Sequence, residues 1–446
     1  MPNEKSLNQL MDGTERIGVI GSPSSTSELT LDILGTAVNR KLVGELSLFR
    51  FAQDGRNHYS LGQITEVELR NIWMEDPTMR SLIRQRGRVD PVTEKQDTHL
   101  GKMTLSAVFQ ESDNAFEPSI LGTVPPTGTQ IHVVNDEILD KLLERYRSEM
   151  FYLGHVYGSI PKLPLWFKHF ASGVSGAGEA YHLGIFGKTG SGKSVLAKMI
   201  MLGYARHPEM SIFVLDPQGE FTKDIQGTVG QEGFPLNLGT TLQYLDKEAQ
   251  VVGIQELILD RWELFQEILF ESPFFEQLTI PRGENRQLAT ENLGNELQKR
   301  RIRLPDLHIR ESFDSAWQIL GRQDVQRRFY RSEPSRQRFN QALQNADPDL
   351  FYRDYWLPIA RLFQKGRPNS VTVDVLLRRT FDLSTQSRPV IIIDLSGERV
   401  RDLYWNDTIK LIVIKRFLDA LVYQAETHYQ ENRSLNSLVI IDEAHR

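Results

Sequence analysis

The first third of the chain alternates apolar and polar positions in short runs, which is the pattern of half-buried β-strands. These runs span residues 16–21, 42–51, 59–69 and 100–109, and turns rich in Gly, Asp and Asn separate them. The more polar stretch 71–97 predicts a helix and loop inserted between two strands. Short strands at this spacing predict a small β-barrel within residues 1–150. Residues 1–150 contain no recognisable set of catalytic residues. We therefore interpret this region as an assembly or docking domain.

Apolar residues three and four positions apart predict helices in later parts of the chain. One such helix is predicted over residues 137–151, before a Pro- and Gly-rich stretch at 161–178. Residues 255–385 carry further helical patterns, at 291–302, 323–329, 335–345 and 355–363. We interpret this region as a helical insertion. Its tryptophans at 262, 317 and 356 are predicted to anchor a core rather than to stack on bases.

Three other runs are continuously apolar, as expected of strands that are buried on both faces of a parallel sheet. They span residues 211–216, 389–394 and 437–442, and each ends in an aspartate. An amphipathic helix is predicted at 407–427, between the second and third runs. The pattern predicts an α/β core made from residues 151–254 and 386–446, with the helical insertion between its two parts.

The acids that end these strands lie at the edge where open α/β sheets bind ligands. Asp216 and Glu220 are therefore candidate site residues. Taken alone, such a pair more often forms a turn and caps a helix, and we favour that interpretation.

Residues 183–194 contain the most specific motif of the chain. Gly187, Gly192, Lys193 and Ser194 fit the P-loop pattern G-x-x-x-x-G-K-[ST], and the surrounding residues predict a strand before the loop and a helix over 195–205. The loop N–H groups would face the phosphates of ATP, Lys193 would reach the β- and γ-phosphates, and Ser194 would ligate Mg²⁺. The residues predicted to bind ATP are Gly187, Lys188, Thr189, Gly190, Ser191, Gly192, Lys193, Ser194 and Val195.

Asp442 and Glu443 follow the last apolar run and form a Walker B pattern, which complements a P-loop. Asp442 is predicted to hold Mg²⁺ together with Ser194. Glu443 and Lys193 are the predicted catalytic residues, with Glu443 polarising the attacking water. The alternative, a buried strand with a capping acid, is disfavoured because a complete P-loop precedes it. An arginine that stabilises the transition state cannot be assigned from the sequence.

Composition narrows the possible functions. The 446-residue chain has a net charge of −6, so a nucleic-acid contact must come from a local patch or a lined pore. A basic cluster in the insertion contains Arg322, Arg327, Arg328, Arg331, Arg336 and Arg338. For it we favour a solvated face, paired with acids of a neighbouring subunit, over a nucleic-acid patch. The chain has no cysteine, which fits a cytoplasmic location, and no apolar run long enough to cross a bilayer.

Four segments together resemble the HerA branch of the HerA/FtsK P-loop ATPases. They are residues 187–194, 216–220, 393–397 and 441–445, and they occur in the order found in that family. The resemblance implies a RecA-like P-loop core with a helical insertion, preceded by a small N-terminal β-barrel. It also implies a hexameric ring that uses ATP and Mg²⁺ to translocate double-stranded DNA through a central pore.

The resemblance has further implications for partners. Bacterial relatives act with a partner nuclease or an NAD-degrading effector in phage defence, and we expect the N-terminal domain to dock such a partner. Since the family continues past the Walker B strand, we expect this chain to be C-terminally truncated relative to it. Two alternatives remain: an ATP-binding ring that serves as a scaffold for an effector, and a conjugation or secretion ATPase, for which no membrane anchor is visible.

Overall fold

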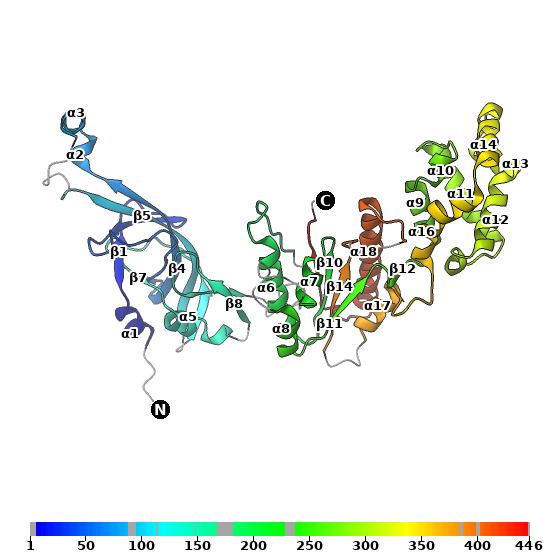
Figure 1. Ribbon diagram of the computed structural model, residues 1–446. Coiled ribbons are helices and arrows are strands. Elements are labelled where there is room, and N and C mark those ends of the chain that lie inside the picture. Colours follow the sequence, from blue (N-terminus) through cyan, green and yellow to red (C-terminus); the bar gives the residue numbers. More distant parts are fainter. Residues whose placement is uncertain are drawn as a thin grey trace. The chain divides into compact units, whose positions relative to one another are not determined.

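The computed structural model describes residues 6–87, 95–112, 115–147, 149–166, 182–227, 237–382, 387–397 and 402–444. The chain forms two compact units, residues 1–168 and 169–446 (Figure 1). The first unit is dominated by antiparallel β-structure. The second unit is a mixed α/β body, which joins a parallel sheet to a group of helices.

A closed barrel of six strands forms the first unit. Its strands are β1 (Arg16–Ile20), β2 (Glu28–Ile33), β3 (Leu46–Gln53), β4 (Arg56–Arg70), β5 (Thr98–Ser112) and β7 (Gln130–Val133). The order β2-β1-β7-β3-β4-β5 closes because β2 also pairs with β5, and β6 (Ala115–Ser119) extends the sheet from β5. The predicted barrel is confirmed. The sequence pattern missed β2 and β7, two of the shorter strands.

Alternation along β3 separates the two faces of the barrel wall. Phe49 and Phe51 belong to one buried cluster with residues of the other barrel strands, whereas Leu46 and Leu48 belong to a second cluster. That second cluster includes residues of α1 (Leu7–Asp12) and α5 (Asp136–Leu142), so these helices cover part of the outer wall. Strands β4 and β5 run on past the barrel to α2 (Ile72–Glu75) and α3 (Pro77–Arg86), as Figure 1 shows. The predicted insertion between two strands is confirmed.

The helix predicted over residues 137–151 is wrong in length. Helix α5 ends at Leu142, a short 3₁₀ turn, η1 (Glu144–Tyr146), follows, and β8 (Met150–His155) pairs with β9 (Lys162–Trp166). The Asn135 side chain caps α5 by accepting a 2.9 Å hydrogen bond from the Ile138 N–H. The backbone groups of β8 instead find their partners on β9, which lies further along the chain.

The sheet of the second unit is parallel, in the order β11-β14-β10-β15. Its strands are β10 (Ser211–Asp216), β11 (Ala249–Gly253), β14 (Val390–Asp394) and β15 (Ser437–Ile441). Phe213 and Leu215 of β10 share a buried cluster with Phe417 of α18 (Asp407–Gln430), and the Phe213 and Phe417 rings lie 5.3 Å apart. The opposite face of the sheet meets α6 (Lys193–Ala205) and α7 (Glu220–Ile225), of which α6 also contacts α8 (Leu238–Tyr244).

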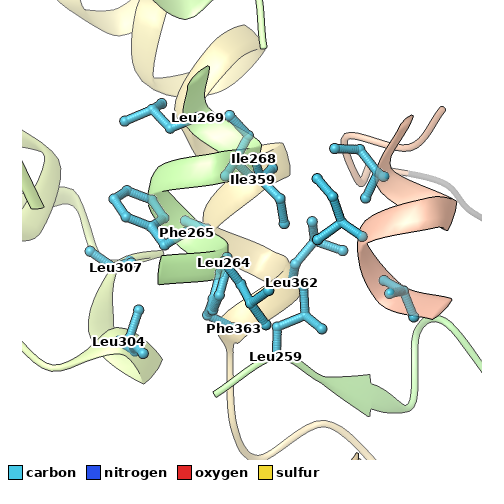
Figure 2. Packing of buried hydrophobic residues seen from close by; sticks show 14 of the residues in the cluster. Leu259, Leu264, Phe265, Ile268, Leu269, Leu304, Leu307, Ile359, Leu362 and Phe363 are labelled. Atoms are coloured by element: carbon cyan, nitrogen blue, oxygen red, sulfur yellow. The ribbon is translucent and has the colours of Figure 1, made fainter. Parts of the chain in front are cut away.

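The helical insertion predicted between the sheet strands is present. Its elements are β12 (Leu257–Ile258), α9 (Trp262–Glu271), α10 (Phe274–Gln277), α11 (Glu284–Lys299), η2 (Leu304–Asp306), α12 (Arg310–Gly321), α13 (Gln323–Phe329), α14 (Glu333–Asn345), α15 (Pro348–Phe351), η3 (Tyr352–Trp356), α16 (Leu357–Ala360), η4 (Arg361–Phe363), β13 (Val371–Thr372) and α17 (Val373–Thr380). Figure 2 shows how Leu264, Phe265 and Ile268 of α9 pack against Ile359, Leu362 and Phe363.

The three tryptophans of the insertion pack as predicted. Trp356 is fully buried, and its indole N–H donates a 2.7 Å hydrogen bond to the Leu307 carbonyl. Trp262 and Trp317 are partly buried against the same cluster. An indole placed in this way supplies a large apolar surface while its single polar group is satisfied.

Candidate functional site

The glycine loop leads directly into α6. Gly190 (φ +77°) and Gly192 (φ +85°) have left-handed backbone conformations that favour glycine, and Gly192 occupies the N-cap position of the helix. No side chain caps α6, so the N–H groups of its first turn are not satisfied by a capping residue. The loop side chains from Lys188 to Ser191 are exposed. An anion can therefore approach the N-terminus of the helix from solvent.

The two polar side chains at the start of α6 are half-buried. Lys193 Nζ donates a 3.2 Å hydrogen bond to the Lys188 carbonyl and so spans the loop. Ser194 is the next residue on the helix, at the position predicted to ligate a metal. Both side chains lie at the base of the loop, where the P-loop mechanism requires them.

The strand predicted before the loop does not form. Residues 182–188 have no regular secondary structure, and Leu183 and Phe186 are exposed, the latter to 94%. Within the described residues, β15 is an edge strand that pairs only with β10. A strand needs a neighbour that satisfies its backbone groups, and the described structure provides none for this segment.

Three aspartates gather at the carboxyl edge of the parallel sheet. Asp216 of β10 is in register with Asp394 of β14. On the other side of β10, Leu215 is in register with Ile441, and the Asp442 N–H donates to the Leu215 carbonyl at 3.2 Å. The sheet topology therefore brings together residues from three distant parts of the sequence, as the strand-end pattern predicts.

Asp216 acts as a helix cap. Its side chain is fully buried and accepts hydrogen bonds from the Glu220 N–H (3.0 Å), the Thr222 N–H (2.8 Å) and the Thr222 hydroxyl (2.9 Å). Burial raises the pKa of Asp216, although the bonds from Thr222 oppose this rise. The interpretation as a turn and cap, favoured from the sequence, is confirmed for this residue, because its carboxylate is committed to the start of α7.

Asp442 has an electrostatic environment that disfavours a bare carboxylate. Burial raises its pKa to about 6, and the nearby acids Glu220, Asp216 and Glu443 contribute to this rise. Its Oδ2 atom is buried without a hydrogen-bond partner among the described residues. A cation would satisfy this oxygen and relieve the repulsion, so the residue fits the predicted role in holding Mg²⁺.

A metal ion at Asp442 would take most of its other ligands from groups other than His, Cys, Asp or Glu side chains. The described residues contain no group of three or more His, Cys, Asp or Glu side chains that could hold a metal ion. Mg²⁺ commonly keeps several waters and is held by one or two protein oxygens together with the phosphates of a nucleotide. Helix α6, which carries Ser194, contacts β15, which leads into Asp442. Ser194 and Asp442 would therefore be the protein ligands of a magnesium nucleotide bound here.

Glu443 is half-buried and has a left-handed backbone conformation, with φ of +53°. Such a conformation costs free energy in a residue with a side chain and is concentrated at functional sites. It follows Asp442 directly, so the two acids leave the strand at a sharp turn. His445, the last residue of the motif quoted from the sequence, lies outside the described residues.

Sequence reasoning missed an ion pair beneath the site. Lys198 Nζ lies 2.5 Å from Asp224 Oδ2, both side chains are buried, and the ammonium also lies 5.2 Å from the centre of the Phe221 ring. The pair joins α6 to α7 and so links the helix of the glycine loop to the helix that Asp216 caps. A lysine within the otherwise apolar end of the α6 sequence was the available signal.

Two arginines of the basic cluster form ion pairs with acids of their own chain. Arg322 and Arg328 each lie 3.0 Å from a carboxylate oxygen of Glu296, and both also approach Asp324. Lys299, with Arg328 as a further contributor, lowers the pKa of Glu296 to about 2. The solvated-face interpretation holds for these arginines, but the acids belong to this chain rather than to a neighbouring subunit.

Residues 180–347 match the protein family described as "Helicase HerA, central domain". The matched region contains the glycine loop, Asp216 and the insertion as far as α14, and it ends before Asp442. A comparison with curated proteins gave no match. Within the described residues, no helix has the length and apolar character needed to span a bilayer.

The glycine loop, the acidic edge of a parallel sheet and the family match together point to a P-loop ATPase. More specifically, the match supports an ATPase of the HerA/FtsK type, which would use ATP with a divalent metal.

Proposed function

We propose that the protein is a HerA-type motor, an ATP-hydrolysing hexameric ring that translocates double-stranded DNA through its pore. The observation that carries the proposal is the complete P-loop at the start of α6, a helix that contacts the strand leading into Asp442 and Glu443. The HerA match over residues 180–347 supports it. The proposal includes a RecA-like fold for the core.

In this proposal each residue of the site has one task. Lys193 binds the β- and γ-phosphates, and the N–H groups at the start of α6 bind phosphate oxygens. Ser194 and Asp442 hold Mg²⁺, which supplies charge neutralisation between the phosphates when bound. Glu443 orients the attacking water and accepts its proton. An arginine from a neighbouring subunit completes the site.

The proposed partners follow from the same assignment. Duplex DNA occupies the central pore, and a nuclease or an NAD-degrading effector docks on the N-terminal domain, consistent with a role in phage defence. The barrel supports this division of tasks because it forms a separate compact unit. A ring is required because the arginine comes from the next subunit.

The test is ATP turnover by the purified chain with and without duplex DNA. We expect DNA to stimulate turnover, and Lys193→Ala or Glu443→Gln to lower kcat by about 100-fold or more. Lys365→Ala and Glu426→Gln, which change the same residue types away from the site, are the matched controls and should retain full activity. Turnover that is unaffected by Glu443→Gln would overturn the assignment of the base, and DNA-independent turnover would remove the motor.

A further inference from the structure

The first unit exposes apolar side chains at the end of a long projection. We call this projection the arm: the described residues 65–87 and 95–102, which comprise the ends of β4 and β5 with α2 and α3 (Figure 1). Leu69, Ile72 and Trp73 of the arm are 62%, 75% and 53% exposed, and Leu82 of α3 is also exposed. Large apolar side chains that gather in this way mark a site of interaction.

The same unit contains an apolar groove with a volume of about 630 Å³, which we call the α5 groove. It is lined by Leu46, Leu61, Gln63, Ser106, Ala107, Val108, Phe109, Pro118, Ser119, Leu139, Leu143, Met150, Val156, Tyr157, Leu163 and Pro164. Tyr157 and Leu163 are exposed, so the groove opens to solvent. Its size and lining suit bulky apolar side chains.

We infer that the arm tip of one copy of the chain inserts into the α5 groove of a second copy, with Ile72 and Trp73 as the anchors. The inference goes beyond the proposed motor because it assigns where copies of the chain meet. It does not require nucleotide turnover.

The arm cannot fill the groove of its own barrel. Gln63 lines the groove, and the same strand continues to Arg70, which is about 23 Å further on at ~3.3 Å per residue. Arg70 is still in register with Thr98 of β5, so the arm is a continuous hairpin that leads away from the groove. An exposed apolar tip and an unfilled pocket at different places on one chain form a head-to-tail contact, which can close into a ring.

Local charge is complementary across this contact. Helix α3 carries Arg80, Arg84 and Arg86 and no acid. Leu139 of α5 and Leu143, which lies between α5 and η1, line the groove. These two elements carry the acids Asp136, Glu137, Asp140 and Glu144 against two basic residues. A basic tip beside an acidic rim favours one orientation of docking.

The net charge of the arm also argues against DNA as its binding partner. Residues 65–102 contain seven basic and seven acidic residues, so their net charge is zero. On the arm, Arg70 pairs with Glu75, and Lys102 pairs with Glu66 and Glu68. Sequence-independent DNA binding depends on excess positive charge that neutralises phosphates. A protein surface with an apolar centre is the better fit.

Because the chain has no cysteine, disulfide cross-linking tests the contact directly. We expect a mixture of full-length Trp73→Cys and Ser119→Cys chains to form a disulfide-linked dimer under mild oxidation, with Ser119→Cys placed in the groove wall. Ser335→Cys, at a half-buried serine of α14 in the other unit, should not cross-link to Trp73→Cys. Cross-linking confined to Trp73→Cys with itself, or absent from the mixture, would overturn the inference.

Light scattering on the full chain provides the second readout. Ile72→Ser with Trp73→Ser should weaken self-association by at least about tenfold, and Ala107→Phe, which fills the groove, should do the same. Tyr244→Ser, a change at an exposed aromatic of the other unit, should not. Unchanged mass in a variant with a normal melting curve would contradict the inference. So would loss of binding to duplex DNA or to anionic vesicles without loss of mass.

The failure of this inference can be told apart from failure of the proposed motor. The cross-link between Trp73→Cys and Ser119→Cys should persist when both chains also carry Lys193→Ala, because the contact lies in the first unit. A cross-link with no ATP turnover would retain the contact and reject the motor. Turnover without a cross-link would do the reverse.

Discussion

The helical insertion and the glycine loop lie in the same unit. They differ in how many of their side chains and backbone groups are packed or paired with residues of the same chain. In the insertion, Trp356 is fully buried and the acid Glu296 is surrounded by arginines of the same chain. In the glycine loop, Phe186 is 94% exposed and the segment before the loop lacks a neighbouring strand within the described residues. The insertion is closely packed by its own residues, whereas the buried Oδ2 atom of Asp442 has no hydrogen-bond partner among the described residues, which fits the proposed binding of a metal.

The largest effect that follows from this difference is expected in the insertion. Trp356→Ala should lower the free energy of unfolding by about 3–5 kcal/mol, because it leaves a cavity and an unsatisfied Leu307 carbonyl. Urea unfolding monitored by circular dichroism is the measurement. Tyr244→Ala, at an 84% exposed aromatic, is the matched control and should change stability by no more than about 0.5 kcal/mol. A small effect of Trp356→Ala on the free energy of unfolding would show that packing in the insertion does not dominate stability.

At Asp442, by contrast, a substitution is expected to raise the free energy of unfolding. Asp442→Asn should stabilise the metal-free protein at pH 8 by about 1 kcal/mol, once solvent screening is allowed for, because the folded state disfavours the charged carboxylate. The pKa of about 6 lies above the usual value of 3.8, so the folded wild type takes up a proton as pH falls through 6. The advantage of the variant should therefore be complete above pH 6 and disappear toward pH 4.

Thermal unfolding in EDTA across pH 4–8 measures this difference between Asp442→Asn and wild type. Glu426→Gln, which neutralises an acid on α18, is the control. If Asp442→Asn is less stable than wild type at pH 8, the residue is a structural acid rather than one poised for a cation. The stabilised variant should at the same time lose ATP turnover, since stability and function oppose each other at such a site.

The sequence was a good guide wherever local pattern alone determines structure. The strand runs predicted the barrel, and 323–329 was predicted as a helix at the bounds of α13. The aspartate at the end of each apolar run correctly indicated an acidic sheet edge, because parallel strands end at the same side. Helix α5 was predicted to be too long because the apolar periodicity of one segment does not show that β8 pairs with β9.

The features that the sequence pattern did not predict depend on contacts between residues far apart in the chain. Asp216 accepts three hydrogen bonds from Glu220 and Thr222, whereas the buried Oδ2 atom of Asp442 has no partner among the described residues, and the strand patterns do not distinguish these two environments. The pairing of Arg322 and Arg328 with Glu296 joins α13 and the residue before it to α11, which could not be predicted from a run of arginines. Residues 182–188, the part of the segment before the glycine loop that the structure describes, form no strand although the loop motif itself is complete.

In the proposed function, Ser194 and Asp442 hold one metal ion on a bound nucleotide. A double-mutant cycle with Ser194→Ala and Asp442→Asn, read as the Mg²⁺ dependence of ATP binding in the full chain, tests it most directly. We expect the two losses to be non-additive by about 1 kcal/mol, since either change removes part of the same coordination shell. Losses that simply add would place the two residues in separate environments and contradict the account.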